Sequence, residues 1–97
     1  MIIAAAVITL MIPGNDSLKG KRRVVKSLIE KVRHKFEAAV AEVGDNDLWQ
    51  KAKIGVALVG NDSQLLNTRL QNIMIFMENQ HLAEIIDFQV ELCYLEK

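Results

Sequence analysis

Two segments of the chain are apolar at almost every position and rich in β-branched residues. They run from Ile2 to Ile12 and from Ala52 to Val59. The first ends at Pro13-Gly14, which cannot continue a strand, and it lacks the basic residues that open a signal peptide. A strand that is apolar on both sides is covered on both sides. The two segments therefore predict the central strands of a sheet.

The segments around them predict two helices and two further strands. Apolar residues recur at helical spacing from Leu18 to about Phe36 and again from Leu66 to Met77, and the turn at 60–63 supplies the N-cap candidates of the second helix. Short alternating patterns at 38–43 and 84–92 are typical of strands. The resulting order, β-α-β-β-α-β, predicts an α+β protein with the ferredoxin-like fold, in which two helices pack on one face of a four-stranded antiparallel sheet. Right-handed crossovers place the first and third strands in the centre.

Length and composition limit the remaining options. The 97 residues suit one domain, spanning 1–97. Cys93 is the only cysteine, so no internal disulfide can form, and no His/Cys spacing resembles a zinc site. No apolar stretch is long enough for a membrane span before a turn signal interrupts it. We therefore expect a cytoplasmic protein without a metal or cofactor.

The charge is distributed unevenly along a chain whose formal net charge is zero. From Lys19 to Lys35 there are eight Lys or Arg residues against one acid, Glu30, so this segment carries +7 and the remainder carries −7. Ser17 is the expected N-cap of the helix. The helix dipole disfavours cations in the first turn, by about 0.3–1 kcal/mol each. The candidate anion-binding residues are Ser17, Lys19, Lys21, Arg22, Arg23 and Lys26.

Two interpretations of this basic segment remain open. Backbone N–H groups and cations at a helix start form a ready site for phosphate or a nucleic-acid backbone. The alternative is a solvated face that nearby acids neutralise. Lys21 projects toward the apolar side of the helix, so we expect its ammonium group to extend past the end of the sheet.

The predicted topology brings further residues to the same end of the sheet. Asp45, Asp47 and Trp49 lie in the loop after the second strand, and His81 follows the second helix. The two aspartates are candidate partners of Lys21 or Arg22, and Trp49 is expected to pack over a core edge, with base stacking as the alternative. Asp45, Asp47 and His81 could bind a metal, but no nucleophile and base are paired in the sequence, so we expect no enzymatic activity.

Several separated motifs resemble the YlxP-like bacterial family of unknown function. They are Ile12-Pro13-Gly14, Ser17-Leu18-Lys19-x-Lys21-Arg22-Arg23-Val24, Val40-Ala41-Glu42-Val43, Asp47-Leu48-Trp49-Gln50 and Asn61-Asp62. The resemblance covers nearly the whole chain and implies a ferredoxin-like fold without catalytic residues. Genes of this family often lie among translation-initiation and ribosome-maturation genes, which implies association with RNA or ribosomes. Gly20 and Met11 depart from the family, which usually has an acid and often a His at these places.

Two functions follow as hypotheses. The first is an RNA- or ribosome-associated binding protein that uses the basic helix start. The second is a protein-interaction or oligomerisation module without nucleic-acid binding. The second faces of the central strands are apolar in either register, and such patches commonly mark interfaces. We therefore expect a homodimer through the open sheet face, with Ala5, Val7 and Met11 in its interface.

Overall fold

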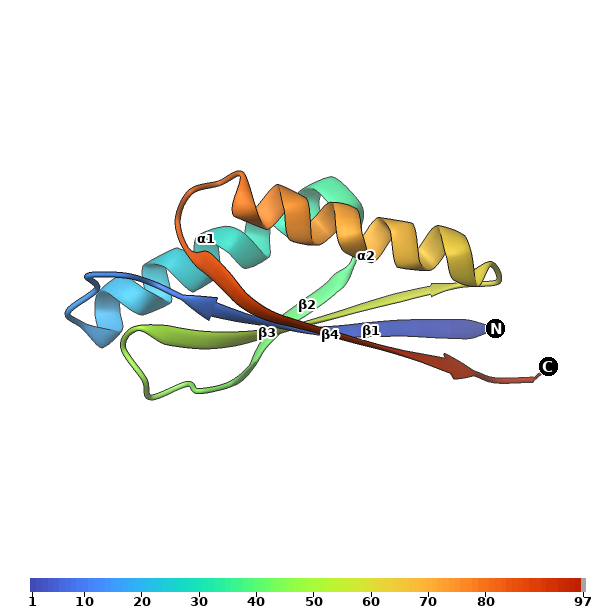
Figure 1. The fold of residues 1–97 in the computed structure, drawn as a ribbon, viewed down its shortest axis with the longest axis horizontal. Coiled ribbons are helices and arrows are strands. Elements are labelled where there is room, and N and C mark those ends of the chain that lie inside the picture. Colours follow the sequence, from blue (N-terminus) through green and yellow to red (C-terminus); the bar gives the residue numbers. More distant parts are fainter. Residues whose placement is uncertain (97) are drawn as a thin grey trace.

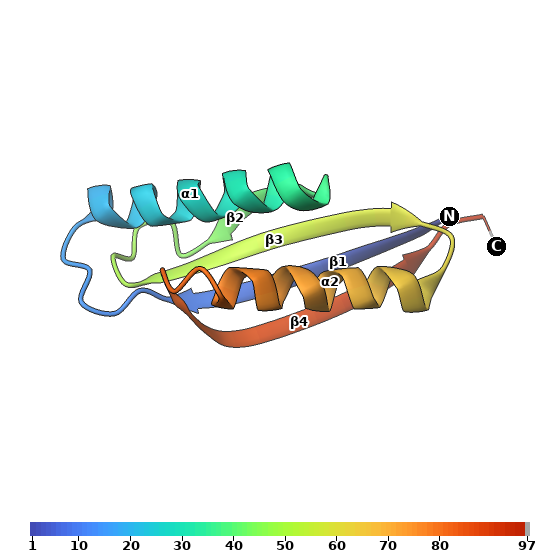
Figure 2. The ribbon, with the colours of Figure 1, turned by 90° about the horizontal axis from the view of Figure 1, so that it is seen from above.

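The computed structural model describes residues 1–96 and contains one sheet and two helices (Figure 1). In chain order the elements are β1 (Ile2–Met11), α1 (Leu18–Phe36), β2 (Ala39–Gly44), β3 (Lys51–Gly60), α2 (Ser63–Glu78) and β4 (Glu84–Tyr94). The sheet is antiparallel throughout, with strand order β2-β3-β1-β4. Both helices lie on the same face of the sheet (Figure 2). The predicted ferredoxin-like fold, with β1 and β3 in the centre, is confirmed.

The core lies between the sheet and the two helices. Even-numbered residues of the central strands point to this side, and one stripe of each helix covers them. The buried apolar residues of these four elements are Ile2, Ala4, Ala6, Ile8, Leu10, Ala52, Ile54, Val56 and Leu58 from β1 and β3, Val25, Leu28 and Val32 from α1, and Leu66, Leu70, Ile73 and Met77 from α2. This period of two on the strands and of three to four on the helices is the pattern that the sequence predicts.

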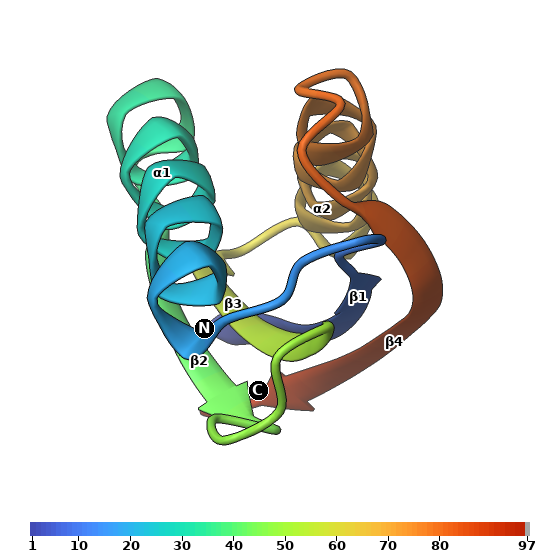
Figure 3. The ribbon, with the colours of Figure 1, turned by 90° about the vertical axis from the view of Figure 1, so that its left-hand side faces the viewer.

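The opposite side of the sheet carries no helix and is called the open face here (Figure 3). Ala5 pairs with Ala57 and Val7 pairs with Gly55, so the odd-numbered residues of β1 and β3 share this face. A register irregularity interrupts β2 at Val43. A Cβ on Gly55 would lie 2.7 Å from Cγ1 of Val43, so the missing side chain of Gly55 makes room for this valine.

Side chains and backbone geometry define the helix ends. Ser17 caps α1, and its Oγ accepts a hydrogen bond of 3.0 Å from the N–H of Gly20. Asp62 caps α2 by accepting from the first backbone N–H groups of that helix. At the end of α1, Glu37 adopts the left-handed conformation with φ of 51°, and Arg69 of α2 donates to the carbonyl oxygen of Phe36. Both predicted helix starts are confirmed.

Three connections gather at one end of the molecule: the β1–α1 loop, the β2–β3 loop and the α2–β4 turn (Figure 1). The view from above in Figure 2 and the end view in Figure 3 agree on this arrangement. The N-terminus and the end of β4 lie at the opposite end, where Met1 and Leu95 are hydrogen-bonded through their backbones. Within residues 1–96, neither helix has the length and apolar character needed to cross a membrane.

Candidate functional site

Lys21 is the most buried charged residue of the basic segment. Its side chain is only 1% exposed. Its Nζ donates to the backbone carbonyl oxygen of Asp45 and lies 3.1 Å from Oε2 of Glu42. A long apolar stem crosses the layer between helix and sheet, and the ammonium group ties α1 to the end of β2. The contacts of Lys21 are therefore structural.

This geometry corrects two expectations. Lys21 does not belong to the exposed anion-binding surface, because its ammonium group is enclosed and already bound to an acid. The carboxylates of Asp45 and Asp47 are not its ion-pair partners. The true partner, Glu42, was missed, although a signal exists: Val40 points to the core, and the period of two in a strand directs Glu42 to the same side.

Asn15 joins the β1–α1 loop to the β2–β3 loop. Its Nδ2 donates to the carbonyl oxygens of Ser17 at 2.7 Å and of Trp49 at 2.5 Å. In return, Nε2 of Gln50 donates to the carbonyl oxygen of Asn15 at 3.1 Å. A Cβ on Gly20 would lie 2.3 Å from Oδ1 of Asn15. The absence of a side chain at Gly20 therefore leaves the space that Asn15 needs to connect the two loops.

Four cations of the predicted site remain on the surface. Lys19, Arg22, Arg23 and Lys26 are all exposed and occupy the first two to three turns of α1. None of them forms an ion pair with any residue in 1–96. No acid is present in the first turn of the helix, so their charge adds to the positive end of the helix dipole. These four residues are called the basic cluster below.

The loop beside the basic cluster exposes two large apolar side chains. Trp49 is 54% exposed and Leu48 is 48% exposed. The prediction that Trp49 packs over a core edge is wrong. The hydrogen bonds accepted by its own carbonyl oxygen and donated by the side chain of Gln50 hold the loop, and the indole is not needed to fill the core. Its aromatic surface is available to a partner.

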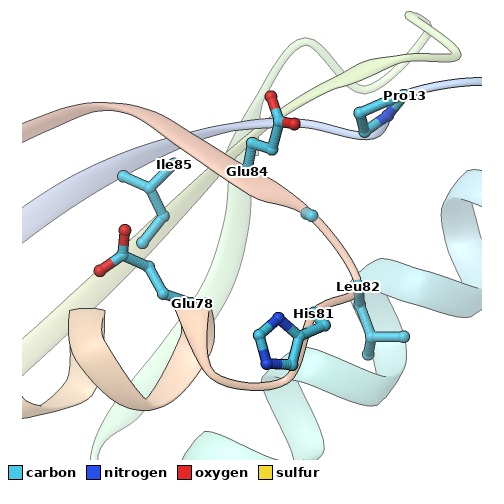
Figure 4. Close-up of a pocket in the computed structure, with 7 residues that line it drawn as sticks. Pro13, Glu78, His81, Leu82, Glu84 and Ile85 are labelled. Atoms are coloured by element: carbon cyan, nitrogen blue, oxygen red, sulfur yellow. The ribbon is translucent and has the colours of Figure 1, made fainter.

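His81 lies at the same end of the molecule as the basic cluster, but it lines a separate hollow. It adopts a left-handed backbone conformation with φ of 57° and lines a hollow of about 510 Å³ with Pro13, Glu78 and Glu84. Figure 4 shows both carboxylates pointing away from the imidazole. Asp45 and Asp47 do not line this hollow, and residues 1–96 contain no cluster of three potential metal ligands. The structure does not assemble the Asp-Asp-His group.

The fold and this surface together define the class of protein: a small ferredoxin-like α+β protein with four exposed cations at one helix start, none of them in an ion pair within residues 1–96. The chain belongs to the family described as "Protein of unknown function (DUF503)", whose model matches residues 3–90. It is 33% identical over 63 residues to the uncharacterized protein YlxP of Bacillus subtilis (strain 168), a match that covers 65% of this chain and 68% of that protein. The resemblance to the YlxP-like family is thereby confirmed.

Solved structures share the fold at low sequence identity. The structural-genomics protein YJCS is 12% identical, with a TM-score of 0.53 and coverage of 92% of this chain and 96% of that one. SnoaB, a cofactor-independent oxygenase from Streptomyces nogalater, is 8% identical, with a TM-score of 0.53 and coverage of 98% and 94%. The designed protein Foldit4 is 11% identical, also with a TM-score of 0.53, and covers 99% and 100%. At these identities the likeness concerns the fold alone.

Proposed function

We propose that this protein binds RNA, free or within a ribosomal particle, through phosphate contacts made by the basic cluster at the start of α1. The contacts come from Lys19, Arg22, Arg23 and Lys26. Lys21 is excluded because its ammonium group is buried and paired.

The observation that supports this proposal is that none of the four cations forms an ion pair within residues 1–96. Four exposed cations lie within eight residues, next to a helix N-terminus, and no described acid pairs with them. Repulsion among them and with the helix dipole destabilises the free protein. An approaching phosphate backbone relieves this repulsion and releases counterions, which is the main source of non-specific affinity for nucleic acids.

The sheet argues against base reading of the type used by RNA-recognition domains. Such domains stack bases on aromatic residues of the two central strands. At the corresponding positions of the open face this chain has Ala5, Val7, Gly55 and Ala57. Recognition is therefore limited to the backbone, with the exposed indole of Trp49 as one adjacent surface for stacking a base. Binding of this kind is weak in sequence preference and sensitive to salt.

The proposal is tested with a charge-reversal variant, Arg22→Glu together with Arg23→Glu. Binding of a fluorescent single-stranded RNA is measured by anisotropy, and co-sedimentation with ribosomal subunits is measured in parallel. Four phosphate contacts on a single strand predict a slope of about −3 in a plot of log affinity against log salt concentration. The variant should lose at least about tenfold in affinity at about 50 mM salt and show a shallower slope.

A matched control is Lys31→Glu together with Lys35→Glu, which makes the same change in net charge at the other end of α1. These residues are also exposed, and the control should bind much as the wild type does. Equal losses in both variants would show that only net charge matters. No binding by the wild type at about 50 mM salt, where phosphate contacts are least screened, would end the proposal.

A further inference from the structure

The open face is divided lengthwise by charge. Apolar β1 runs through it, with lysines on β3 to one side and acids on β4 to the other. Two cross-strand rows repeat this arrangement: Lys53, Thr9 and Asp87 in one, and Lys51, Met11 and Glu84 in the next. Within each row, the strand pairing places the lysine and the acid on opposite sides of the β1 residue. In residues 1–96 neither lysine forms an ion pair.

The two sides of β1 on the open face also differ in the size of their side chains. Toward the other end of the strands, Gly55 and Ala57 of β3 line a shallow hollow of about 500 Å³ together with Val43 of β2, which packs on Gly55. Gln89 and Glu91 of β4 occupy the matching rows on the other side of β1 and are exposed. One flank of β1 is therefore low and partly basic, and the other is raised and acidic.

We propose that two copies of this chain pack their open faces together about a two-fold axis that runs along β1. Such an axis exchanges the two flanks and keeps the rows at the same height. It therefore sets β3 of each copy against β4 of the other. Lys53 meets Asp87 and Lys51 meets Glu84 of the other copy, while Gln89 and Glu91 enter the hollow that Ala41, Val43 and Ala57 line.

Self-complementarity is what selects a second copy as the occupant. A two-fold interface must match a surface with itself, and this surface carries both halves of each match, in charge and in size. An axis between β1 and β3 would instead set Lys53 and Lys51 of β3 against Thr9 and Met11 of β1. An axis across the strands would set the lysines of β3 against Ala57 and Val59. Of these three axes, only the one along β1 pairs opposite charges.

The central contact in this arrangement is β1 against β1. Val7 is half-buried in one copy and lies at the middle of the strand. Sedimentation equilibrium at about 10 µM, where a micromolar interface is largely formed, should give twice the mass of one chain. Val7→Lys should give the mass of a single chain while its circular dichroism spectrum stays that of the wild type.

A pair of charge variants tests the axis itself. Variant A carries Lys51→Glu and Lys53→Asp, so both flanks are acidic; variant B carries Glu84→Lys and Asp87→Lys, so both are basic. Each alone sets like charges against each other and should be monomeric. Mixed in equal amounts, A and B should associate one to one, because each flank of A then meets an opposite flank of B. Lys31→Glu with Lys35→Glu, away from this face, should remain dimeric.

Three outcomes would each overturn the proposal. A strictly monomeric wild type at about 10 µM leaves the face to a different occupant. A dimer that persists in both A and B has another interface or another axis. Variants that are monomeric alone and stay monomeric when mixed show that the flanks do not meet, and thermal unfolding of A and B distinguishes this result from loss of the fold.

Discussion

Lys21 stabilises the protein through the contacts of its buried ammonium group. It links Glu42 and the carbonyl of Asp45, and Glu42 itself is only 19% exposed. Removing one partner of a buried ion pair leaves the other charge without compensation, which costs far more than the pair contributes when intact.

We expect Lys21→Met to lower the free energy of unfolding by about 3 kcal/mol, because the carboxylate of Glu42 then loses its partner. Urea denaturation followed by circular dichroism measures this loss. Adding Glu42→Leu should restore much of it, since an apolar pair of similar size needs no charge compensation. Lys26→Met, on the exposed side of the same helix, should change the value by no more than about 0.5 kcal/mol. If Lys21→Met alone were as stable as the wild type, the structural role of Lys21 would be contradicted.

Gly20 gives a second prediction at this scale, and its sign is the reverse of the usual rule. Alanine normally stabilises a helical position over glycine by about 0.5–1 kcal/mol. Here its Cβ would lie 2.3 Å from Asn15 Oδ1, so Gly20→Ala should destabilise the protein by about 1–2 kcal/mol. In an Asn15→Ala background the same change should become neutral or stabilising. Thermal denaturation of the four proteins in this cycle measures the coupling, and additive effects would refute the steric explanation.

At the scale of the elements, the C-terminal end of α1 has a backbone conformation that is unfavourable for the residue found there. Its C-cap, Glu37, has φ of 51° and ψ of 42°, a conformation that costs an L-residue roughly 1–2 kcal/mol and glycine very little. Glu37→Gly should therefore stabilise the protein by about 1 kcal/mol. The midpoint of denaturant unfolding measures the change, and Glu37→Ala serves as the control because it keeps the steric cost. Equal midpoints for the two variants would show that the cap conformation is not responsible.

The elements themselves could be predicted from the sequence, because their signals are local and repeated. The two-sided apolar runs indicated β1 and β3, and Ser17 and the turn at 60–63 indicated the helix starts; all lie within one or two residues of the observed bounds. The positions of Lys21 and Trp49 were harder to predict. Each depends on how two loops meet, and the hydrogen bonds of Asn15 that hold those loops have no periodic signature.

At the scale of the whole molecule, the sequence predicted which end collects the loops but not which side chains remain free there. Topology alone brings the start of α1, the β2–β3 loop and His81 together. Whether a cation is accessible depends on single contacts, and one of the five predicted cations is buried. RNA binding, dimerisation and the absence of enzymatic activity stay predictions.

The sheet pairs its first strand with its last. β1 lies between β3 and β4, and Leu95 and Met1 are joined by two hydrogen bonds of 2.8 Å. In synthesis from the N-terminus, β1 is made before either neighbour and cannot be fully paired until Tyr94 has followed. The edge of β1 that pairs with β4 therefore stays unpaired until almost the entire chain has been made. Such long-range pairing slows folding, because the entropic cost of closing a long loop arises before the stabilising contacts form.

A circular permutant should shorten the sequence separation between β1 and β4. The short distance between Met1 and Leu95 allows a brief Gly/Ser linker, and new ends between Gly60 and Asn61 keep the cap of α2 intact. In the permuted chain β4 and β1 become neighbours in sequence, so their pairing needs only a hairpin. Stopped-flow refolding should then be roughly tenfold faster than for the natural order of strands. Equal refolding rates would mean that the pairing of β1 with β4 forms only after the rate-limiting step.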